Sequence, residues 1–242
     1  MLLILRVIIV IIYSIIVCLF GSIWCLFSPR NPRHVATFSH IFGYLSILFG
    51  INLEIRQPKG LKKIESAIYI ANHQNNYDMI TVANIVPDRT VILGKKSLLW
   101  IPFFGTLYWL TGNMLIDRSD RAACKTLTVL VRQCQQQKVS IWIFPEGTRS
   151  HGRGLLPFKN GAFYAAITVG VPIIPICISN LHNKINLNRL DNGLVIIEML
   201  SPICTTPFNK SQVRVLAKYC HELMEKKIQE LNIEVSKFNA IK

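Results

Sequence analysis

The chain has 242 residues, of which 51% are hydrophobic and 17% charged, and 27 lysines and arginines against 13 acidic residues give a formal net charge of +14. This composition excludes a disordered or low-complexity chain, which would be poor in apolar residues, and it argues against an ordinary cytosolic enzyme. A protein that rests on an anionic membrane would be both this apolar and this basic. The length suits one domain of ordinary size with a small appendage.

The cysteines are scattered, odd in number and free of any C-x-x-C pair. This usage suggests neither a disulfide framework nor a zinc site, and it predicts a reducing, cytosol-facing compartment. The seven residues are Cys18, Cys25, Cys124, Cys134, Cys177, Cys204 and Cys220.

Residues 7–27 form an uncharged apolar stretch of 21 residues. A membrane-spanning helix needs ~20 such residues, so the stretch is long enough to span. It is longer than the apolar core of ~7–15 residues found in a cleavable signal peptide, so we expect it to be retained. The alternative is a helix buried in the core of the protein.

A second apolar run, residues 36–51, is shorter and interrupted by polar residues, which is typical of an interfacial helix. Arg30 and Arg33 lie in the loop between the two runs, and positively charged loops tend to stay cytoplasmic. Two full spans would place this loop on the far side. The charges therefore favour either one span with an interfacial helix, or a helical hairpin that dips into the cytoplasmic leaflet, and the sequence leaves both open.

From about residue 52 short apolar runs alternate with helical patterns. This alternation predicts an α/β fold with a mostly buried sheet flanked by helices, following an N-terminal apolar two-helix membrane segment. We divide the chain into membrane-anchoring or interfacial helices, residues 1–51, and a catalytic domain, residues 52–242. The expected strands are 66–71, 90–93, 114–116, 140–144, 172–178 and 194–199, and the expected helices are 78–85, 119–137 and 211–231. The last of these helices is amphipathic, and the residues expected broadly on one side of it are Val215, Leu216, Tyr219, Leu223 and Ile228.

His73 and Asp78 form a His-x4-Asp pair in the loop that follows the first of these strands. On a continuous helix, five positions would leave the two side chains about 140° apart. They meet only if a turn folds Asp78 back, and Asp78 is also the expected cap of the next helix. The carboxylate could then hold one imidazole nitrogen and leave the other free as a base. The spacing alone is weak evidence, and the alternative is a surface loop with a helix cap.

Three more blocks follow in order, at 112–118 (GNMLIDR), 144–150 (FPEGTRS) and 171–175 (VPIIP). Within the second of them, Gly147 permits a positive φ or a close backbone approach. Arg149 offers a forked donor that matches phosphate oxygens, unless it pairs with a structural carboxylate instead. The last block is apolar and is interpreted as structural.

These four blocks together resemble the signature of the glycerolipid acyltransferase family, NHx4D, GxxxIDR, FPEGTRS and VPIIP. The resemblance covers residues 66–178, extends through 94–102, and is most marked for bacterial members that acylate 1-acylglycerol 3-phosphate. It implies that His73 is the general base and that Asp78 orients it. The residues that it assigns to binding of the phosphate-bearing acceptor are Arg118, Glu146, Gly147, Thr148 and Arg149.

Lys95 and Lys96 are further candidates for contact with an anion. The alternative, that they are solvated surface lysines, has at least equal weight.

The resemblance implies transfer of an acyl group from a thioester, on coenzyme A or acyl carrier protein, to the 2-hydroxyl of 1-acylglycerol 3-phosphate (lysophosphatidic acid), giving phosphatidic acid. An alcohol is a poor nucleophile at neutral pH and needs a positioned base. The sequence contains no G-x-S-x-G, so we expect direct attack in a ternary complex. No metal or redox cofactor is expected, the thioester being a co-substrate. The expected setting is a bacterial inner membrane, with membrane lipids as partners and the catalytic domain facing the cytoplasm.

Four other functions are weighed against this one. A related acyltransferase could use glycerol 3-phosphate or another lysolipid as its acceptor. A lipase or esterase lacks its nucleophile motif here, and a non-catalytic membrane protein that binds anions would use the charge without the chemistry. Nucleic acid is not an expected partner, because no basic helix, finger or aromatic-basic signature accompanies the positive charge.

Overall fold

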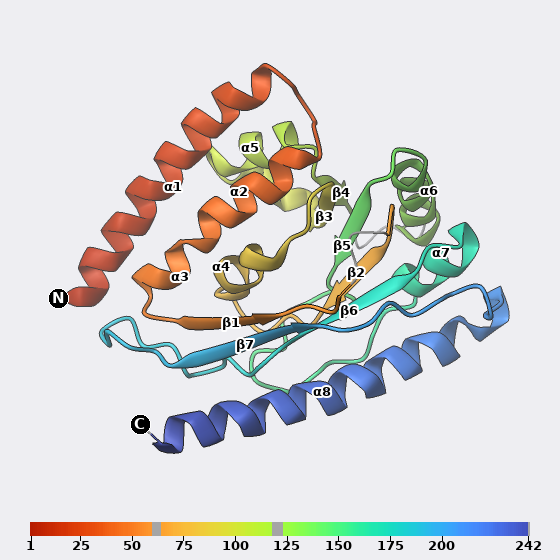
Figure 1. Ribbon diagram of the computed structural model, residues 1–242. Coiled ribbons are helices and arrows are strands. Elements are labelled where there is room, and N and C mark those ends of the chain that lie inside the picture. The colour runs from red at the N-terminus through yellow and green to blue at the C-terminus, as the bar shows by residue number, and fades with distance from the viewer. Residues whose placement is uncertain (60–63, 118–122, 242) are drawn as a thin grey trace.

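The computed structural model describes residues 1–59, 64–117 and 123–241, and these build three layers in which helices cover both faces of one sheet (Figure 1). The seven strands lie in the order β1-β7-β6-β2-β5-β3-β4. All neighbours pair in parallel except β6 and β7, which are antiparallel. The strands are β1 Asn52–Arg56, β2 Ile68–Ala71, β3 Thr90–Lys95, β4 Met114–Ile116, β5 Ser140–Ile143, β6 Ile173–Ile178 and β7 Leu194–Met199.

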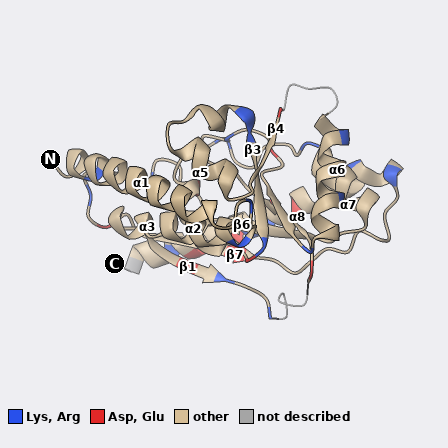
Figure 2. Ribbon diagram, turned by 90° about the horizontal axis from the view of Figure 1, so that it is seen from above, with Lys and Arg blue, Asp and Glu red and all other residues tan. Residues whose placement is uncertain are grey.

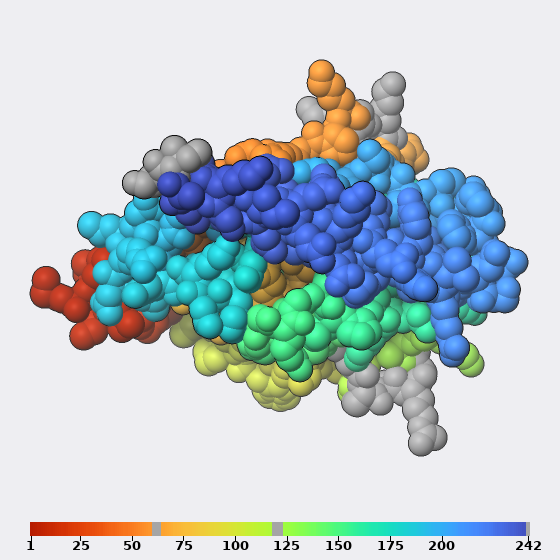
Figure 3. Space-filling view, turned by 90° about the horizontal axis from the view of Figure 1, so that it is seen from below, coloured from red at the N-terminus to blue at the C-terminus, as the bar shows by residue number. Residues whose placement is uncertain are grey.

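The helices fall into two groups by their packing. One face of the sheet carries α1, α2, α4 and α5 with the short α3. The opposite face carries α6, α7 and the long C-terminal α8, and Figure 3 shows α8 lying across that side of the molecule. The first group is α1 Leu2–Leu26, α2 Arg33–Gly43, α3 Leu45–Leu48, α4 Asp78–Thr81 and α5 Phe104–Leu110, with the 3-10 turns η2 Val82–Ile85 and η3 Lys96–Trp100. The second is α6 Ala123–Gln136, α7 Gly161–Val169 and α8 Val213–Ile241, the last preceded by η4 Lys210–Gln212.

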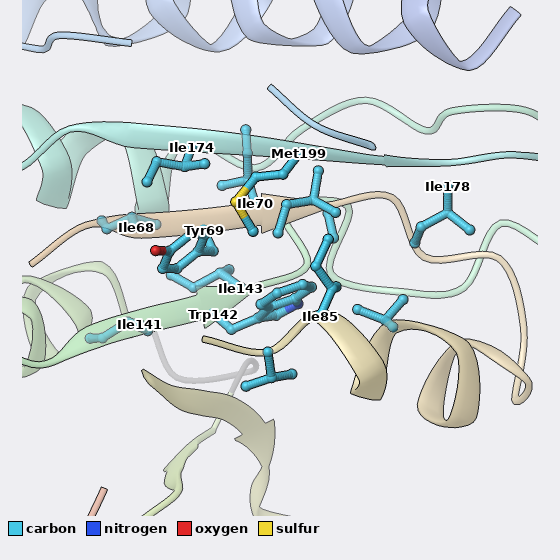
Figure 4. Close-up of a cluster of buried hydrophobic side chains, with 14 of the residues drawn as sticks. Ile68, Tyr69, Ile70, Ile85, Ile141, Trp142, Ile143, Ile174, Ile178 and Met199 are labelled. Atoms are coloured by element: carbon cyan, nitrogen blue, oxygen red, sulfur yellow. The ribbon is translucent and has the colours of Figure 1, made fainter. Parts of the chain in front are cut away.

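The core lies around the three central strands, β6, β2 and β5, whose residues are buried throughout (Figure 4). Strands covered on both faces have no solvent-facing side, so their sequences are continuous apolar runs and do not alternate. Burial of each such Ile or Val side chain stabilises the fold by ~1.5–3 kcal/mol relative to its exposure. A rigid central sheet therefore supports the loops at its edges.

The predicted α/β class with a mostly buried sheet is confirmed, and all six expected strands are present within one or two residues of their predicted ends. One strand and two α-helices were not predicted, namely β1, α5 and α7. In the long C-terminal helix we expected Val215, Leu216, Tyr219, Leu223 and Ile228 on the inner side. Two of these are wrong, because Val215 is 57% and Tyr219 49% exposed. The buried residues of α8 are Val213, Leu216, Ala217, Cys220, Met224, Leu231 and Val235.

The first predicted apolar segment forms α1, a helix long and apolar enough to cross a membrane. It is almost wholly free of charged residues in Figure 2. Few of its side chains are buried, so the alternative of a core helix is wrong; the buried residues are Arg6, Cys18, Gly21 and Cys25.

The second predicted apolar segment is helical but broken, forming α2 and α3. Its inner side joins the main core through Val35, Ala36, Leu45, Phe49 and Ile51. Residues before and after position 51 thus share one core, and the division at 51/52 stays a prediction.

Along its length α1 is attached to the rest of the protein. The Arg6 guanidinium donates to the carbonyl oxygens of Leu187 (2.9 Å) and Arg189 (2.6 Å). Further along, the Tyr13 hydroxyl donates to the Ile41 carbonyl oxygen at 2.7 Å. Near the C-terminal end of the helix, a small apolar cluster joins it to α2 and α5 through Cys18, Cys25, Phe38, Leu107 and Leu110.

Candidate active site

The candidate site lies at the carboxyl ends of β2 and β5, in the middle of the sheet. From β2 the chain goes on to β3 on one side, and from β5 it returns to β6 on the other side. In open α/β sheets, ligands bind where successive connections leave in opposite directions, because a crevice opens there. The loops after these two strands are therefore the expected place for chemistry.

Two amides hold the loop after β2 against the end of β6. The Asn72 side chain accepts the Ile178 N–H at 2.9 Å and donates to the Ile178 carbonyl oxygen at 3.1 Å. The Gln74 side chain accepts the Leu181 N–H at 2.7 Å and donates to the Ser179 carbonyl oxygen at 3.0 Å. Both side chains are buried, so they fix the backbone on either side of His73.

Between these two amides, His73 contacts Asp78, as the sequence predicted. The distance from His73 Nδ1 to Asp78 Oδ2 is 2.7 Å, and Asp78 is 1% exposed. The same carboxylate oxygen accepts the backbone N–H groups of Gln74 (2.6 Å) and Asn75 (3.0 Å). An oxygen that accepts from two amides is the acceptor toward the ring as well, so Nδ1 carries a proton, and in the neutral ring Nε2 is the nitrogen with the lone pair.

The predicted helix cap is wrong in its details. Asp78 is the first residue of α4, and its side chain caps no N–H of that helix. It turns back instead to the two amides of the preceding loop. This is the turn that the His-x4-Asp spacing required.

The ring of His73 lies flat on Phe144, with the ring centroids 4.2 Å apart and the planes at 23°. The His73 side chain is 15% exposed. One face of the imidazole is thus covered, and its orientation is fixed by stacking as well as by Asp78. Phe144 follows β5 directly, so the stacking joins the two loops of the site.

Two backbone hydrogen bonds also join these loops. The Ser150 N–H donates to the His73 carbonyl oxygen at 2.8 Å, and the His151 N–H donates to the Gln74 carbonyl oxygen at 3.0 Å. Residues 73–74 and 150–151 therefore form one unit.

Glu146 is buried, with 4% of its surface exposed. Its Oε1 accepts the His73 backbone N–H at 2.6 Å, and its Oε2 accepts the Leu156 backbone N–H at 2.9 Å. Burial raises the pKa of the Glu146 carboxyl above its usual value, although both amide donors oppose that shift. Both oxygens thus have partners within the protein.

The turn after Glu146 has the conformation that its glycine predicts. Gly147 has φ +71°, and its N–H donates to the Phe144 carbonyl oxygen at 3.1 Å. A Cβ at this position would lie 2.7 Å from Cε of Lys159, so the lysine side chain packs directly on the turn. Thr148 is exposed.

Arg149 is half-buried beside this turn. Its Nε is buried and has no hydrogen-bond partner among the described residues. No described carboxylate pairs with it, which removes the alternative of a structural ion pair within the described part of the chain.

The other predicted cations lie on the next part of the sheet. Lys95 ends β3 and Lys96 begins η3, and both side chains are exposed. Strand β3 pairs with β5, so its carboxyl end lies on the same edge as the site. Arg118, the remaining predicted site residue, lies outside the described residues.

Within the described ranges, no three His, Cys, Asp or Glu side chains lie close enough together to hold a metal ion. The expectation of acyl transfer without a metal or redox cofactor stays a prediction.

Three residues of the site were not predicted from the sequence, namely Asn72, Gln74 and Phe144. The first two flank His73 in the same block, and Phe144 opens the FPEGTRS block. Their positions beside predicted site residues were the only signal, because a buried amide that bonds to a distant strand has no local pattern.

These loops at the carboxyl edge of an α/β sheet belong to a known class of protein. The sequence family described as Acyltransferase matches residues 52–179, which include His73, Asp78 and the turn around Gly147. The chain belongs to this acyltransferase family.

Relatives within the family match over nearly the whole chain. The chain is 63% identical to the 1-acyl-sn-glycerol-3-phosphate acyltransferases of Salmonella typhimurium and Escherichia coli, over 99% of this chain and 98% of each relative. Its fold is similar to the crystal structure of the 1-acyl-sn-glycerophosphate (LPA) acyltransferase of Thermotoga maritima, with a TM-score of 0.76 at 22% identity, covering 95% of this chain and 94% of that one.

Proposed function

We propose that the protein transfers an acyl group from a thioester, on coenzyme A or acyl carrier protein, to the 2-hydroxyl of 1-acylglycerol 3-phosphate, giving phosphatidic acid. Relatives named 1-acyl-sn-glycerol-3-phosphate acyltransferase match over nearly the full chain, and this similarity supports lysophosphatidic acid as the acceptor. The observation that carries the chemistry is the His73–Asp78 pair, together with Arg149 on the neighbouring loop, whose Nε has no partner within the described ranges.

In the proposed reaction His73 is the general base. Its Nε2 removes the proton of the 2-hydroxyl as the oxygen attacks the thioester carbonyl carbon. The ring becomes an imidazolium, which the Asp78 carboxylate stabilises through Nδ1–H. Because stacking and hydrogen bonds fix the ring before the substrate arrives, little reorganisation accompanies the step.

The tetrahedral intermediate then collapses by breaking the carbon–sulfur bond. The sulfur leaves as a thiolate, whose conjugate acid has a pKa near ~8.5, so strong acid assistance is unnecessary. The imidazolium can return its proton to the thiolate, which restores His73. No covalent acyl-enzyme is required.

We assign the phosphate of the acceptor to the turn after Glu146. Gly147, Thr148 and Arg149 lie there, and the Nε of Arg149 is a buried donor without a partner among the residues that the structure describes. A phosphate oxygen would satisfy it with a charge-assisted bond. Arg118 and Lys95 remain further candidates for the same anion.

We propose that α1 seats the enzyme on the cytoplasmic face of a bacterial inner membrane. A spanning helix would carry its N-terminal end away from the catalytic domain. Here Arg6, near that end, bonds to carbonyl oxygens of residues 187 and 189, and Cys25, near the other end, is buried against the domain. This favours an in-plane or dipping arrangement with the outer apolar side of α1 in the leaflet.

Product analysis tests the activity. Purified protein would be offered a panel of acceptors, namely lysophosphatidic acid, glycerol 3-phosphate and lysolipids with other head groups, each with an acyl-CoA or an acyl carrier protein thioester. We expect phosphatidic acid as the product from lysophosphatidic acid. When both substrates are varied, we expect double-reciprocal plots of the initial rate whose lines intersect, as a ternary complex requires. Another preferred acceptor would overturn the assignment of substrate. Parallel lines or a trapped acylated residue would overturn the direct mechanism.

Tags on the two termini test the membrane arrangement. We expect an N-terminal and a C-terminal tag to be reached by protease only in inverted membrane vesicles. An N-terminal tag that is cleaved in intact spheroplasts would show that α1 spans the bilayer.

A further inference from the structure

We infer that Glu146 is a positioning residue that holds His73 at a fixed distance from the phosphate-binding turn. This assignment replaces the acceptor-binding role that the family resemblance implied for Glu146. The inference rests on the proposed function only in its kinetic test, which measures kcat and KM with lysophosphatidic acid.

The geometry gives Glu146 two partners within the protein. Its Oε1 accepts the His73 N–H at 2.6 Å and its Oε2 accepts the Leu156 N–H at 2.9 Å. Negative charge also makes a carboxylate an unsuitable neighbour for a phosphate monoester, since like charges repel. Glu146 is therefore well placed to hold the backbone and badly placed to bind the acceptor.

The two hydrogen bonds of the Glu146 carboxylate, to the backbone N–H groups of His73 and Leu156, form a bridge between three segments that are far apart in the sequence. His73 follows β2, Glu146 follows β5, and Leu156 lies in the segment that leads to α7. Glu146 is also the residue immediately before Gly147, so any movement of its side chain relative to His73 changes the distance between the base and the phosphate turn. A misplacement of about 1 Å in a reacting group can reduce a rate by ~10².

An ionised carboxylate in this place has a cost that a neutral residue would avoid. Burial raises the pKa of the Glu146 carboxyl, with the nearby Asp78 charge adding to the shift. A group whose pKa is higher in the folded than in the unfolded state is held ionised at neutral pH at the expense of stability. What the carboxylate provides in return is two acceptor oxygens, because a glutamine has one acceptor and one donor.

The first test observes the bridge directly, without an activity assay. The protein has six histidines, so selective ¹⁵N-histidine labelling gives six backbone amide signals, and His73→Gln identifies that of residue 73. A short bond to a carboxylate deshields the amide proton, so we expect the His73 amide at the low-field end in the unmodified protein. Glu146→Gln should move it upfield. A His73 amide at an ordinary position, or one that Glu146→Gln leaves unmoved, would overturn the inference.

The second test separates positioning from binding. We expect Glu146→Gln to lower kcat by ~10–100-fold and to change the KM for lysophosphatidic acid by less than about threefold. Glu146→Asp keeps the charge but is one methylene too short to reach both amides, so it should fail to restore kcat. Full rescue by Asp, or a rise in acceptor KM with unchanged kcat, would overturn the inference.

Glu198→Gln is the matched control. Glu198 lies on β7 and pairs with Arg56 and Lys227, away from the site loops, so its loss should alter neither kcat nor the His73 amide. If the unmodified protein fails to acylate lysophosphatidic acid, the proposed function fails, while the amide measurement still decides the role of Glu146.

Discussion

His73, the proposed base, and residues 147–149, the proposed anion-binding turn, lie on adjacent loops that differ in how their functional groups are held. Asp78 Oδ2 accepts three donors, and the His73 ring is stacked on Phe144. Arg149, by contrast, keeps a buried Nε without a partner among the described residues. The orientation of the His73 ring is thus set before any substrate binds, even though Asp78 Oδ1 is also buried without a partner among the described residues. In the proposed mechanism, the turn gains its missing partner from the phosphate that it binds.

This difference has an energetic meaning. A buried donor without a partner destabilises the free protein by ~1–3 kcal/mol, and a bound phosphate recovers that free energy. A base that is already oriented needs no such completion, so its hydrogen bonds contribute to the transition state without rearrangement. Removal of the base should therefore reduce kcat, whereas changes at the turn should raise KM.

The largest expected effect is that of His73→Ala. Without the base, kcat should fall by at least ~10²–10⁴, and the fold should persist because the His73 backbone keeps its hydrogen bonds. Steady-state rates with lysophosphatidic acid, together with circular dichroism, measure both. A folded variant with near-normal turnover would contradict the assignment.

His151→Asn is the control for that experiment. His151 is exposed on the neighbouring loop at φ +49°, a conformation that asparagine tolerates, and it contacts Gln74 through its backbone N–H. We expect its kcat to stay within about threefold of the unmodified value, as is usual when an exposed side chain outside the chemistry is replaced.

The next effect is that of Asp78→Asn, which we expect to lower kcat by ~10² and to destabilise the protein by ~1–3 kcal/mol. The backbone amides of residues 74 and 75 should hold the new amide oxygen toward His73, so the ring tautomer is kept and only the charge is lost. Asp78→Ala, which also loses the acceptor, should be slower still. Equal rates for the Asn and Ala variants would show that orientation contributes nothing.

Contacts within one loop of the site could be predicted from the sequence, whereas contacts between its two loops could not. The His73–Asp78 contact could be predicted because both residues belong to one loop and the spacing demanded a turn. Glu146 could not be paired with His73 in this way, since the bond at 2.6 Å joins residues 73 positions apart and depends on the neighbouring positions of β2 and β5. Sequence reasoning gave Glu146 the same role as its neighbours in the block, although its side chain points into the protein.

The fold divides similarly. Continuous apolar runs predicted the buried strands, because a strand covered on both faces has a distinctive composition. The edge strand β1 (NLEIR) was missed because two of its five residues are charged, so the segment contains no continuous apolar run. Helix α7 (GAFYAAITV) was missed because a short helix that is apolar on nearly all sides has no amphipathic period.

At the anion-binding turn, Arg149→Lys should raise the KM for lysophosphatidic acid by ~10-fold, because a forked pair of hydrogen bonds becomes one point contact. The thioester KM and kcat should change little. An acceptor without a phosphate should discriminate poorly between the two proteins. Arg214→Lys, an exposed position on α8, serves as the control and should leave both KM values unchanged.

An equal rise in both KM values, or unfolding of Arg149→Lys, would contradict the role of Arg149 in phosphate binding. The site would then be sought at Arg118 and Lys95. The comparison between base and turn would also fail, since the unpartnered Nε would serve the fold and not the ligand.

The smallest expected effect is that of Lys95→Gln. Lys95 is exposed at the end of β3, so its charge can attract the acceptor only through solvent. Exposed charges interact by at most about 1 kcal/mol, which limits the rise in acceptor KM to about fivefold at low ionic strength. The rise should disappear in about 0.5 M salt, where the screening length is a few ångströms. The effect of Arg149→Lys should persist at that salt concentration, because a half-buried donor in direct contact is screened less.

Lys96→Gln is the control at the neighbouring position and should behave like Lys95→Gln or have a smaller effect. A rise above tenfold that survives salt would make Lys95 a direct ligand, and no rise at low salt would make it a solvated surface lysine.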